Sequence, residues 1–452
     1  MITSLNSTVQ NSGYFDIVIG NPPYLKEGKI SKSIFKQYKK LPYYQGKLDL
    51  WYMFACECID LLKNNRFLCF IATNNWVTSS GAKKLRNKII SDTQMKHIVD
   101  FGKFLIFEKA SIQTMIMLFS KNSKIDNYIL DLRKLTGDTK LADVLDLLNN
   151  KINIKAQYLF PQIIKQNLIN KLLTFSLNDA ILDKISDNCL YSSEKEVANG
   201  IHPHYNFINK KLSLIYNLEI GTGIFGLSNK EKIELKLSKK EISLIKPYYT
   251  TKQIHKYYTD PENKLWLIYT NSNFNNPRSM DNYPNLKKHL DKFKKIITSD
   301  NKPYGLHRAR EERFFKDEKI IVQRKCVGTP SFSYSNFDCY VSATFYIIKT
   351  NRFNIKYLIG LLNSKLIAFW LKNKGKMQGN NFQIDKEPLL QIPIFNANIY
   401  QQKPIIELVD KILKIKEGNI KADTDDMEQK IDLKIYEFYK LSNEEIEIIE
   451  NN

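Results

Sequence analysis

The sequence predicts an α/β protein: a doubly wound sheet, then a mixed α+β domain, and then a helical C-terminal tail. Three observations support this expectation. Apolar runs alternate with amphipathic stretches through residues 1–125, short aromatic and β-branched runs fill residues 196–395, and residues 396–452 return to helical spacing. Residues 126–195 are rich in Leu, Ile, Asn and Lys and are interpreted as a mostly helical bridge. These four ranges are the expected domains.

The first expected strand is Phe15–Ile19, an apolar run that is stopped by Gly20, Asn21 and two prolines. This pattern is typical of a buried strand that ends in a functional loop. A helix is expected from Asp49. The other elements expected in this domain are a strand at 66–73, a helix at 81–90, and strands at 97–101 and 114–119. Because strands and helices alternate, the sheet is expected to be parallel.

Further helices are expected towards the C-terminus. Residues 355–373 carry the clearest amphipathic pattern of the mixed domain, and the GKMQGNN that follows at 375–381 is expected to form an exposed loop. Residues 403–416 and 427–440 predict two helices in the tail.

The composition favours a nucleic-acid partner. Of 452 residues, 68 are Lys or Arg and 47 are Asp or Glu, which gives a formal net charge of +21. A polyanion would relieve the repulsion among so many cations, although a solvated, lysine-rich surface is the alternative. The six cysteines include no CxxC pair, so a reduced, cytoplasmic protein without a metal site is expected. No apolar run reaches the roughly 18 residues of a membrane span.

The most specific chemical signal is Asn21-Pro22-Pro23-Tyr24, directly after the first strand. An exocyclic amine is a poor nucleophile because its lone pair is delocalised into the ring, so an enzyme that alkylates it must hold both N–H groups with acceptors. The Asn21 side-chain oxygen and the Pro22 carbonyl can be those acceptors. Pro23 biases Pro22 towards an extended conformation, and Tyr24 offers an aromatic face for a flipped base.

At these residues the chain resembles the gamma-type adenine-N6 DNA methyltransferases, in particular the TaqI-like and type IIG restriction-modification enzymes. FDIVIGNPPY is similar to their fourth motif, GKLDLWYMF to the fifth, RFLCFIATNNW to the sixth and FLIFEKASIQTMIM to the eighth. The resemblance implies part of a class I methyltransferase (Rossmann-like) sheet. It also implies methyl transfer from S-adenosylmethionine to a flipped adenine in double-stranded DNA. It places Phe107 on the second face of that base, with Phe104 as the alternative.

The acceptor is not fixed by this motif alone, because NPPY also resembles the motif of enzymes that methylate glutamine side chains or structured RNA. The later segments favour DNA. Residues 303–326, 337–350 and 357–394 resemble the TaqI-type target-recognition domain. The residues expected to contact DNA are Arg308, Arg310, Arg324, Lys325, Lys374, Lys376, Gln378, Asn380 and Asn381. The lysines suit phosphates, and the Arg, Gln and Asn side chains can also contact base edges. His307 is interpreted as a structural or phosphate-contacting residue.

The resemblance also implies a glycine-bearing cofactor loop ahead of the NPPY motif, yet only 20 residues precede Asn21. We therefore expect the first strand to form an exposed sheet edge, and a second polypeptide to carry the cofactor-binding part and possibly a nuclease. The weak internal candidate for the cofactor loop is LEIGTGIFG at 218–226, with Gly221 and Gly223. The alternative functions are a non-catalytic DNA-specificity subunit and a decayed fragment of a type IIG enzyme.

Overall fold

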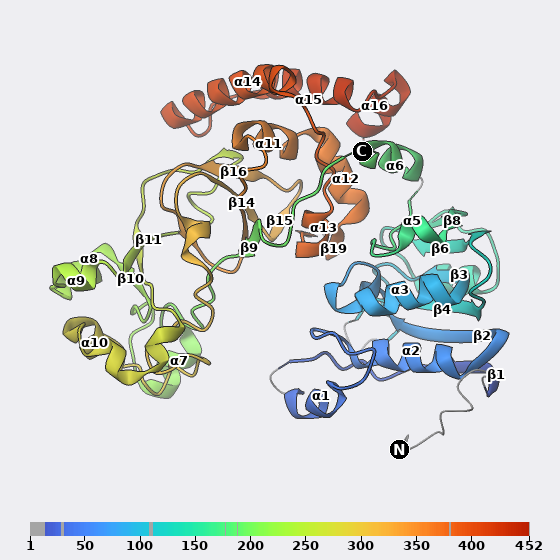
Figure 1. Ribbon diagram of the computed structural model, residues 1–452, viewed down its shortest axis with the longest axis horizontal. Helices are drawn as coiled ribbons and strands as arrows, with labels where there is room; N and C mark the ends of the chain where they lie inside the picture. Colours follow the sequence, from blue (N-terminus) through green and yellow to red (C-terminus); the bar gives the residue numbers. More distant parts are fainter. Residues whose placement is uncertain are drawn as a thin grey trace. The chain divides into compact units, whose positions relative to one another are not determined.

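The computed structural model describes residues 14–28, 31–107, 112–176, 178–187, 189–378 and 381–451. The chain forms two compact units (Figure 1). Unit 1 comprises Met1–Leu182 with Asn373–Gly375, and unit 2 comprises Asp183–Lys372 with Lys376–Asn452. In the part of the chain that the structure describes, no helix has the length and apolar character needed to span a membrane.

Unit 1 is built on a six-stranded sheet with the order β1-β2-β4-β3-β6-β7. Its strands are β1 (Phe15–Gly20), β2 (Leu62–Thr73), β3 (Thr93–Asp100), β4 (Thr114–Lys121), β6 (Asp131–Leu135) and β7 (Ala156–Leu159). β1 runs parallel to β2 and β3 runs parallel to β6, but β4 is antiparallel to both β2 and β3, and β7 is antiparallel to β6. The expectation of a parallel sheet is therefore wrong. No helix is described between β3 and β4, and a strand that follows its neighbour without a crossover helix returns antiparallel.

Helices cover the two faces of this sheet unequally. Helices α2 (Leu50–Leu61) and α3 (Lys83–Asp92) pack on one face, over Leu68, Phe70 and other buried residues. Helix α4 (Leu141–Leu148) packs on the other face, in a small cluster that includes Val99 and Leu135. At the β1 edge, Phe15, Ile17 and Ile19 are 49%, 60% and 76% exposed. Among the described residues β1 pairs with β2 alone, in agreement with the prediction of an exposed sheet edge.

The segment expected to be a helical bridge, 126–195, instead contains strands as well as helices. Besides β6 and β7 it forms β5 (Asn127–Ile129) and β8 (Gln162–Ile164), which pair with each other, and the helices α4, α5 (Lys165–Leu168) and α6 (Asp179–Ser186). The open side of β3 accepts β6 as a neighbour, so pairing with an existing sheet overrides the local helical tendency. The expectation of a mostly helical bridge is therefore wrong.

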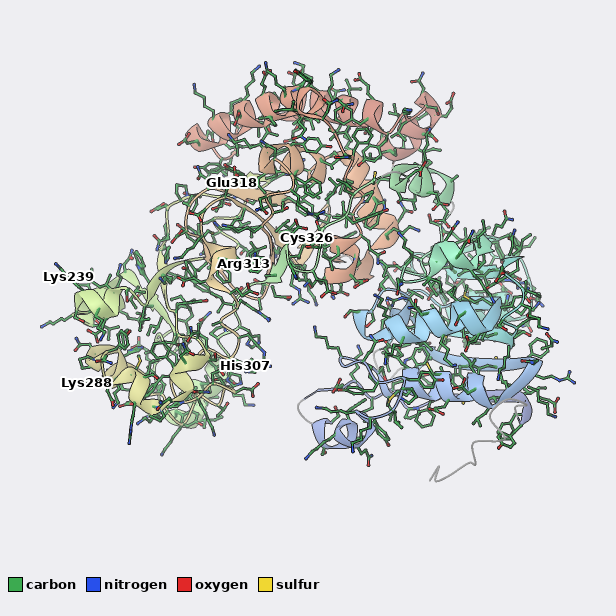
Figure 2. All side chains as sticks on the ribbon, in the orientation of Figure 1. Lys239, Lys288, His307, Arg313, Glu318 and Cys326 are labelled. Atoms are coloured by element: carbon green, nitrogen blue, oxygen red, sulfur yellow. The ribbon has the colours of Figure 1, made fainter. Side chains whose placement is uncertain are left out.

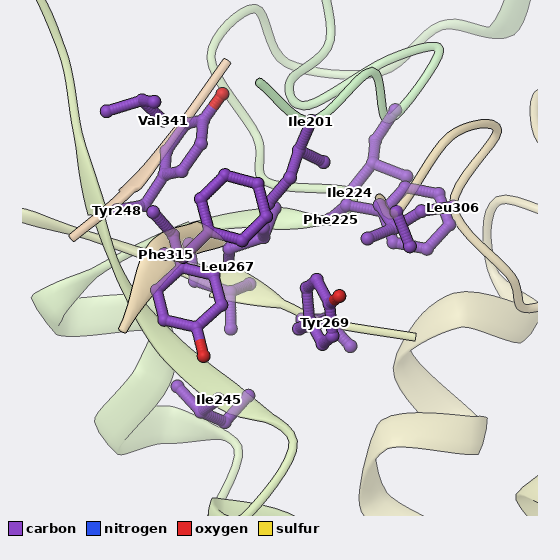
Figure 3. Packing of buried hydrophobic residues seen from close by; sticks show 14 of the residues in the cluster. Ile201, Ile224, Phe225, Ile245, Tyr248, Leu267, Tyr269, Leu306, Phe315 and Val341 are labelled. Carbon is purple, nitrogen blue, oxygen red and sulfur yellow. The ribbon is translucent and has the colours of Figure 1, made fainter. Parts of the chain in front are cut away.

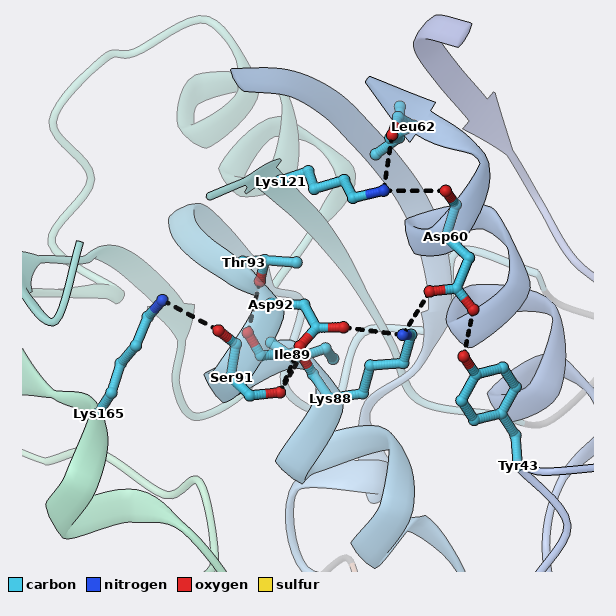
Figure 4. A network of polar contacts seen from close by, with 10 residues as sticks. All are labelled: Tyr43, Asp60, Leu62, Lys88, Ile89, Ser91, Asp92, Thr93, Lys121 and Lys165. Atoms are coloured by element: carbon cyan, nitrogen blue, oxygen red, sulfur yellow. Dashed lines mark hydrogen bonds and ion pairs between the residues drawn. The ribbon is translucent and has the colours of Figure 1, made fainter. Parts of the chain in front are cut away.

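A polar network lies at the end of unit 1 where β2 begins (Figure 4). The Lys88 ammonium on α3 lies 2.6 Å from an Asp60 carboxylate oxygen on α2 and 2.8 Å from Asp92. Tyr43 also donates to Asp60. The Lys121 ammonium on β4 donates to the Asp60 and Leu62 carbonyls. The network joins two helices and two strands at the end opposite the loop after β1.

Unit 2 contains two mixed sheets. The four-stranded sheet has the order β10 (Gly226–Ser228), β13 (Leu265–Ile268), β11 (Ile245–Tyr249), β17 (Tyr340–Val341). The five-stranded sheet has the order β12 (Tyr257–Tyr258), β16 (Phe332–Ser335), β14 (Lys319–Gln323), β18 (Phe345–Ile348), β9 (Val197–Asn199). Helices α7 (Lys210–Tyr216), α8 (Asn229–Glu234), α9 (Lys239–Ile242) and α10 (Pro284–Asp291) accompany the first sheet. Figure 3 shows the core between these elements, with Leu267, Tyr248 and Phe315 at its centre.

A third sheet and the C-terminal helices complete unit 2. Strands β19 (Lys376–Gln378) and β20 (Asn381–Gln383) form a hairpin that pairs with β15 (Lys325–Val327), so the segment at 375–381, expected to be a loop, instead contains paired strand residues. The single helix expected at 355–373 is two helices, α11 (Ile355–Leu362) and α12 (Lys365–Lys374). The break occurs at Asn363, whose side-chain amide makes two hydrogen bonds with the Phe332 backbone, of 2.8 and 2.9 Å.

The tail of unit 2 is helical, as the spacing predicted. It consists of α13 (Lys386–Leu390), α14 (Ile399–Gly418), α15 (Asp425–Phe438) and α16 (Asn443–Glu450). Helix α11 lies so close to α14 that a Cβ atom added at Gly360 would be 2.6 Å from Ile405 Cγ2.

Candidate functional site

The NPPY loop lies at the edge of the unit 1 sheet where β1, β2 and β3 all end. β1 and β2 are parallel, and β2 and β3 are both antiparallel to β4, so their carboxyl ends share one edge. Asn21 follows β1 there, Asn74 follows β2, and Asp100 ends β3. The Asn74 amide donates to Asp100 across this edge, with 3.1 Å between Nδ2 and Oδ1. In α/β sheets this edge is the usual place for a ligand.

The loop is fixed at both ends. β1 pairs with β2 through Gly20, and beyond the motif the Leu25 N–H donates to Asp49 Oδ1 at 2.9 Å while the Leu25 carbonyl accepts from the Leu50 N–H at 2.8 Å. Pro22 is buried and Asn21 is exposed. The Asn21 side chain makes no hydrogen bond to any residue that the structure describes, so its amide is available to a substrate.

Tyr24 is held in place by its hydroxyl group. The half-buried phenol donates to the Ile71 carbonyl at 2.7 Å, and burial, followed by the nearby Asp49 carboxylate, raises the pKa of Tyr24 to about 12. The phenol therefore stays a neutral donor at physiological pH. Its ring centroid lies 6.4 Å from that of Phe107, with the two planes tilted by 57°.

The structure distinguishes the two phenylalanines proposed for base stacking. Phe107 faces Tyr24, whereas Phe104 packs against the small cluster with Val99 and Phe101. Phe107 is thus the one placed to share a base with Tyr24, and its role in stacking stays a prediction.

Asp49 is a buried residue that holds the end of the NPPY loop through its hydrogen bond with the Leu25 N–H. It is only 2% exposed, and its Oδ2 atom has no hydrogen-bond partner among the described residues. Burial is the largest cause of the raised pKa of this carboxyl group. A buried carboxyl group beside the motif was not anticipated from the sequence, where Asp49 served only as the expected start of a helix.

The arginines expected to contact DNA converge in unit 2. Arg308 is half exposed and lies 3.3 Å from an Asp300 carboxylate oxygen. The Arg310 Nε–H donates to the Gly200 carbonyl at 3.3 Å, and burial, then the charges of Arg308 and Arg324, lower the pKa of Arg310. The Arg324 guanidinium lies 5.1 Å from the Tyr346 ring centroid. Mutual repulsion among three guanidinium groups is what an anionic ligand would relieve.

The other expected DNA contacts fall into three groups. Lys325 lies on β15 and faces Gln383 in the ladder with β20, so the two segments expected to contact DNA share one sheet. Lys376, Gln378 and Asn381 belong to the hairpin of this sheet, but their side chains, like all of Asn380, lie outside what the structure describes. Lys374 is engaged within unit 1 instead: its ammonium lies 3.0 Å from the Thr174 carbonyl and 3.5 Å from Asp179.

The glycines considered for a cofactor loop do not form one. The Gly221 N–H donates to the Ile208 carbonyl, and the Gly223 N–H donates to the Glu231 carboxylate at 2.6 Å. A nucleotide-binding loop of this type lies between a strand and a helix and leaves its N–H groups to the ligand. Here the glycines precede β10, so the interpretation of Gly221 and Gly223 as a cofactor site is wrong.

Two further residues of this surface were missed in the sequence. His202 and His204 lie beside His307, with ring centroids 5.3 Å and 6.1 Å from that of His307. The HPH string at 202–204 was the available signal, but nothing local connects it to residue 307. We use the name His–Arg cluster for His202, His204, His307, Arg308, Arg310 and Arg324.

Comparison with known families separates the same two parts of the chain. Residues 3–107 match the Eco57I restriction-modification methylase family, and residues 246–394 match the TaqI-like C-terminal specificity domain. The NPPY loop falls within the first match, and Arg308, Arg324 and the β15–β20 pair fall within the second.

Similar proteins extend over most of the chain. The type II methyltransferase M.HindII of Haemophilus influenzae is 24% identical, covering 93% of this chain and 83% of its own length. The type II restriction enzyme and methyltransferase RM.Eco57I of Escherichia coli is also 24% identical, over 84% of this chain, which spans 40% of that protein.

The same fold occurs in a solved structure. The type IIL restriction-modification enzyme MmeI, solved in complex with DNA, shares 14% identity and a TM-score of 0.59, over 95% of this chain and 55% of its own. Together with the two matching families, these similarities confirm the resemblance drawn from the motifs. The chain is similar to the type II restriction-modification methyltransferases, and it matches the Eco57I restriction-modification methylase family in its first part and the TaqI-like C-terminal specificity domain in its second.

Proposed function

We propose that this chain methylates the N6 amine of adenine in double-stranded DNA as the modification activity of a restriction-modification system in the cytoplasm. The observation that carries the proposal is the NPPY loop at the carboxyl edge of the sheet, with Tyr24 6.4 Å from Phe107. The specificity-domain match and the convergent arginines support DNA as the substrate. Glutamine or structured RNA would not require such a domain.

The residues of the loop have separate roles in this reaction. The Asn21 side-chain oxygen and the Pro22 carbonyl accept hydrogen bonds from the two N–H groups of the adenine amine and so localise the nitrogen lone pair. S-adenosylmethionine, when bound, supplies the electrophilic methyl group. Tyr24 stacks on one face of the flipped base and Phe107 on the other.

The two rings differ in how freely they can adjust to the base. A base between parallel rings needs centroids roughly 7 Å apart, twice the ~3.5 Å contact distance between carbons. The rings are 6.4 Å apart and tilted, and the Tyr24 hydroxyl is bound to Ile71. Phe107 is therefore the ring that rotates when the base enters.

The glycine segment at 218–226 is committed to internal hydrogen bonds and does not offer the N–H groups of Gly221 and Gly223 to a cofactor. We propose that a second polypeptide supplies the cofactor site and pairs with β1. The exposed Phe15, Ile17 and Ile19 support the proposal, because an apolar strand at an open sheet edge is stabilised by another strand.

The test is transfer of a labelled methyl group from S-adenosylmethionine to duplex DNA, with the full chain alone and with the product of the reading frame immediately upstream. The methylated base is identified by nucleoside chromatography after digestion. We expect N6-methyladenine only with the second protein. Activity of the chain alone would refute the second polypeptide, while label in cytosine, RNA or protein would refute the adenine assignment.

The catalytic role of the loop is tested in the same assay. We expect Asn21→Ala to reduce methyl transfer by about 10²- to 10³-fold, as for loss of one transition-state hydrogen bond, and to leave duplex binding intact. Asn64→Ala, an exposed asparagine in β2, is the matched control. Full methylation by the Asn21 variant would indicate a non-catalytic, DNA-binding role for this chain.

A further inference from the structure

The arginines of unit 2 differ in what neutralises their charge. Three of them form ion pairs with carboxylates: Arg308 with Asp300 at 3.3 Å, Arg313 with Glu311 at 2.8 Å, and Arg352 with Glu196 at 2.6 Å. Arg310 and Arg324, by contrast, form no ion pair with any residue that the structure describes. Both belong to the His–Arg cluster, and their charge is left for a ligand to balance.

Arg310 is held by backbone and hydroxyl groups instead of an acid. Its Nε–H donates to the Gly200 carbonyl at 3.3 Å, and its own carbonyl accepts from the Tyr269 hydroxyl at 2.9 Å. Its φ of 69° lies in the left-handed region, which residues other than glycine rarely adopt. The residue is exposed, and its two terminal nitrogens make no hydrogen bond to any described residue. The side chain is therefore anchored at one end and accessible at the other.

Arg324 lies where two sheets of unit 2 meet. It follows β14 and precedes β15, and its carbonyl accepts from the Ile384 N–H at 2.9 Å, just after β20. Its Nη1 group donates to the Ala343 carbonyl at 3.2 Å, and its guanidinium lies 5.1 Å from the ring centroid of the buried Tyr346. Its Nε atom is buried without a hydrogen-bond partner among the described residues. A carbonyl and a ring thus orient this guanidinium without neutralising it.

The two guanidinium groups are close enough to affect each other. Burial, then the charges of Arg308 and Arg324, lower the pKa of Arg310. Like charges that are held near each other without an acid are relieved by a ligand that offers hydrogen-bond acceptors. In duplex DNA such acceptors are the phosphate oxygens and the edges of the bases.

The way in which these two arginines are held favours a base over a phosphate. A phosphate attracts any nearby cation, so a flexible side chain serves as well as an oriented one. Guanine presents two acceptors side by side in the major groove, O6 and N7, and the planar donor fork of arginine matches this pair. An arginine whose plane is already fixed loses little freedom on binding them. Arg310 and Arg324 meet this condition.

We propose that Arg310 and Arg324 each bind a guanine, through its O6 and N7 atoms, in the major groove of the recognised duplex. The pair therefore determines part of the recognised sequence, while Arg308 binds phosphate and adds affinity for any duplex. This inference rests on the proposed function for its ligand, duplex DNA, but it can fail separately.

The experiment finds the recognised sequence and then removes each arginine. The full chain selects duplexes from a pool with a randomised central segment, and the bound molecules are sequenced. We expect Arg324→Gln to lose the preference for one G·C pair of the selected sequence, and Arg310→Gln to lose it for another. Fluorescence anisotropy should show affinity for the selected duplex falling about 5- to 150-fold in each variant, with an unchanged slope of log affinity against log salt.

Lysine variants separate a base contact from a phosphate contact. Arg324→Lys and Arg310→Lys keep the positive charge but lack the planar fork, so we expect the same loss of preference as with glutamine. They also carry the test if circular dichroism shows that a glutamine variant is unfolded. Arg313→Gln is the matched control and should keep the wild-type sequence preference. Arg313 lies on η6 (Glu312–Phe315), and Figure 2 shows it in the same part of unit 2 as Cys326 of β15.

The outcomes are distinct. Weaker binding to every duplex, with the salt slope reduced by about 1, would identify a phosphate contact and overturn the proposal. An unchanged sequence preference in the variants overturns it as well, as does a wild-type chain that binds duplexes without selecting any sequence. These results leave adenine methylation standing. Absence of duplex binding, with and without the upstream protein, overturns both.

Discussion

The NPPY loop and the His–Arg cluster differ in how their residues are brought together. The loop is four consecutive residues placed by the end of one strand, with Tyr24 bound to Ile71 and Leu25 bound to Asp49. The cluster is assembled from segments near 202, 308 and 324, and its charged groups repel one another. A site made of consecutive residues can be found in a sequence, whereas a cluster that is assembled by tertiary structure cannot.

The difference predicts that a backbone change can destroy the cluster while sparing the loop. A Cβ atom at Gly200 would lie 2.0 Å from the Ser342 carbonyl oxygen, so Gly200→Ala forces two backbone segments apart. We expect unfolding of unit 2 to become easier by about 3 kcal/mol, measured by urea denaturation, with loss of duplex binding. Gly418→Ala, where the added atom meets nothing within 4 Å, is the control. Unchanged stability would show that the backbone around Gly200 can shift to accommodate the added methyl group.

In the NPPY loop, by contrast, a substitution should lower the methylation rate without lowering the stability of the fold. We expect Tyr24→Ala to lower the methylation rate about 5- to 150-fold, because stacking of a base on an aromatic ring contributes about 1–3 kcal/mol. Tyr24→Phe keeps the ring and loses the hydrogen bond to Ile71, so its loss should be smaller. Rates are compared in single-turnover methylation. Equal losses in the two variants would show that the hydroxyl, rather than the ring, is essential.

Arg308 and Lys374, both expected from the sequence to contact DNA, should differ in their effect on duplex binding. Arg308→Ala should weaken binding to every duplex and reduce the slope of log affinity against log salt by roughly 1, as for one phosphate contact. Lys374→Ala should leave the slope unchanged, because its ammonium is engaged by Thr174 and Asp179. Anisotropy titrations between low and moderate salt measure both. A reduced slope for the Lys374 variant would show that Lys374 contacts a DNA phosphate.

The smallest expected effect concerns Asp49. Burial raises the pKa of its carboxyl group, so the folded state favours the protonated form, and stability is lost as pH rises through the folded-state pKa. Asp49→Asn keeps an acceptor for the Leu25 N–H and removes the charge. We expect its melting temperature to exceed that of the wild type by about 2 °C at pH 7, with the two converging in acid. A lower melting temperature at pH 7 would mean that the charge is stabilising.

The sequence predicted the elements of unit 1 better than their arrangement. Apolar runs correctly located β2 and β4, since a buried strand needs such runs whichever way it points. The direction of β4 depends on its connection to β3, which hydrophobicity does not encode. Asn363 likewise breaks a continuous helical pattern because it binds the Phe332 backbone, a partner distant in sequence.

The candidate site divides in the same way. Asn21 to Tyr24 could be identified because four residues and a strand suffice to define their chemistry. The choice between Phe104 and Phe107 required the fold, since both follow β3 and only one faces Tyr24. His202 and His204 were missed because their neighbours at 307 and 308 are brought to them by backbone pairing between remote loops.

The β19–β20 hairpin has a consequence for how such proteins diversify. It joins the rest of unit 2 as an added pair of strands along β15, beside the large core of the two mixed sheets. Substitutions in the hairpin strands can therefore leave the packing of that core unchanged. Under the proposed function, substitutions in this hairpin would change how unit 2 contacts DNA while the NPPY loop in unit 1 stays constant.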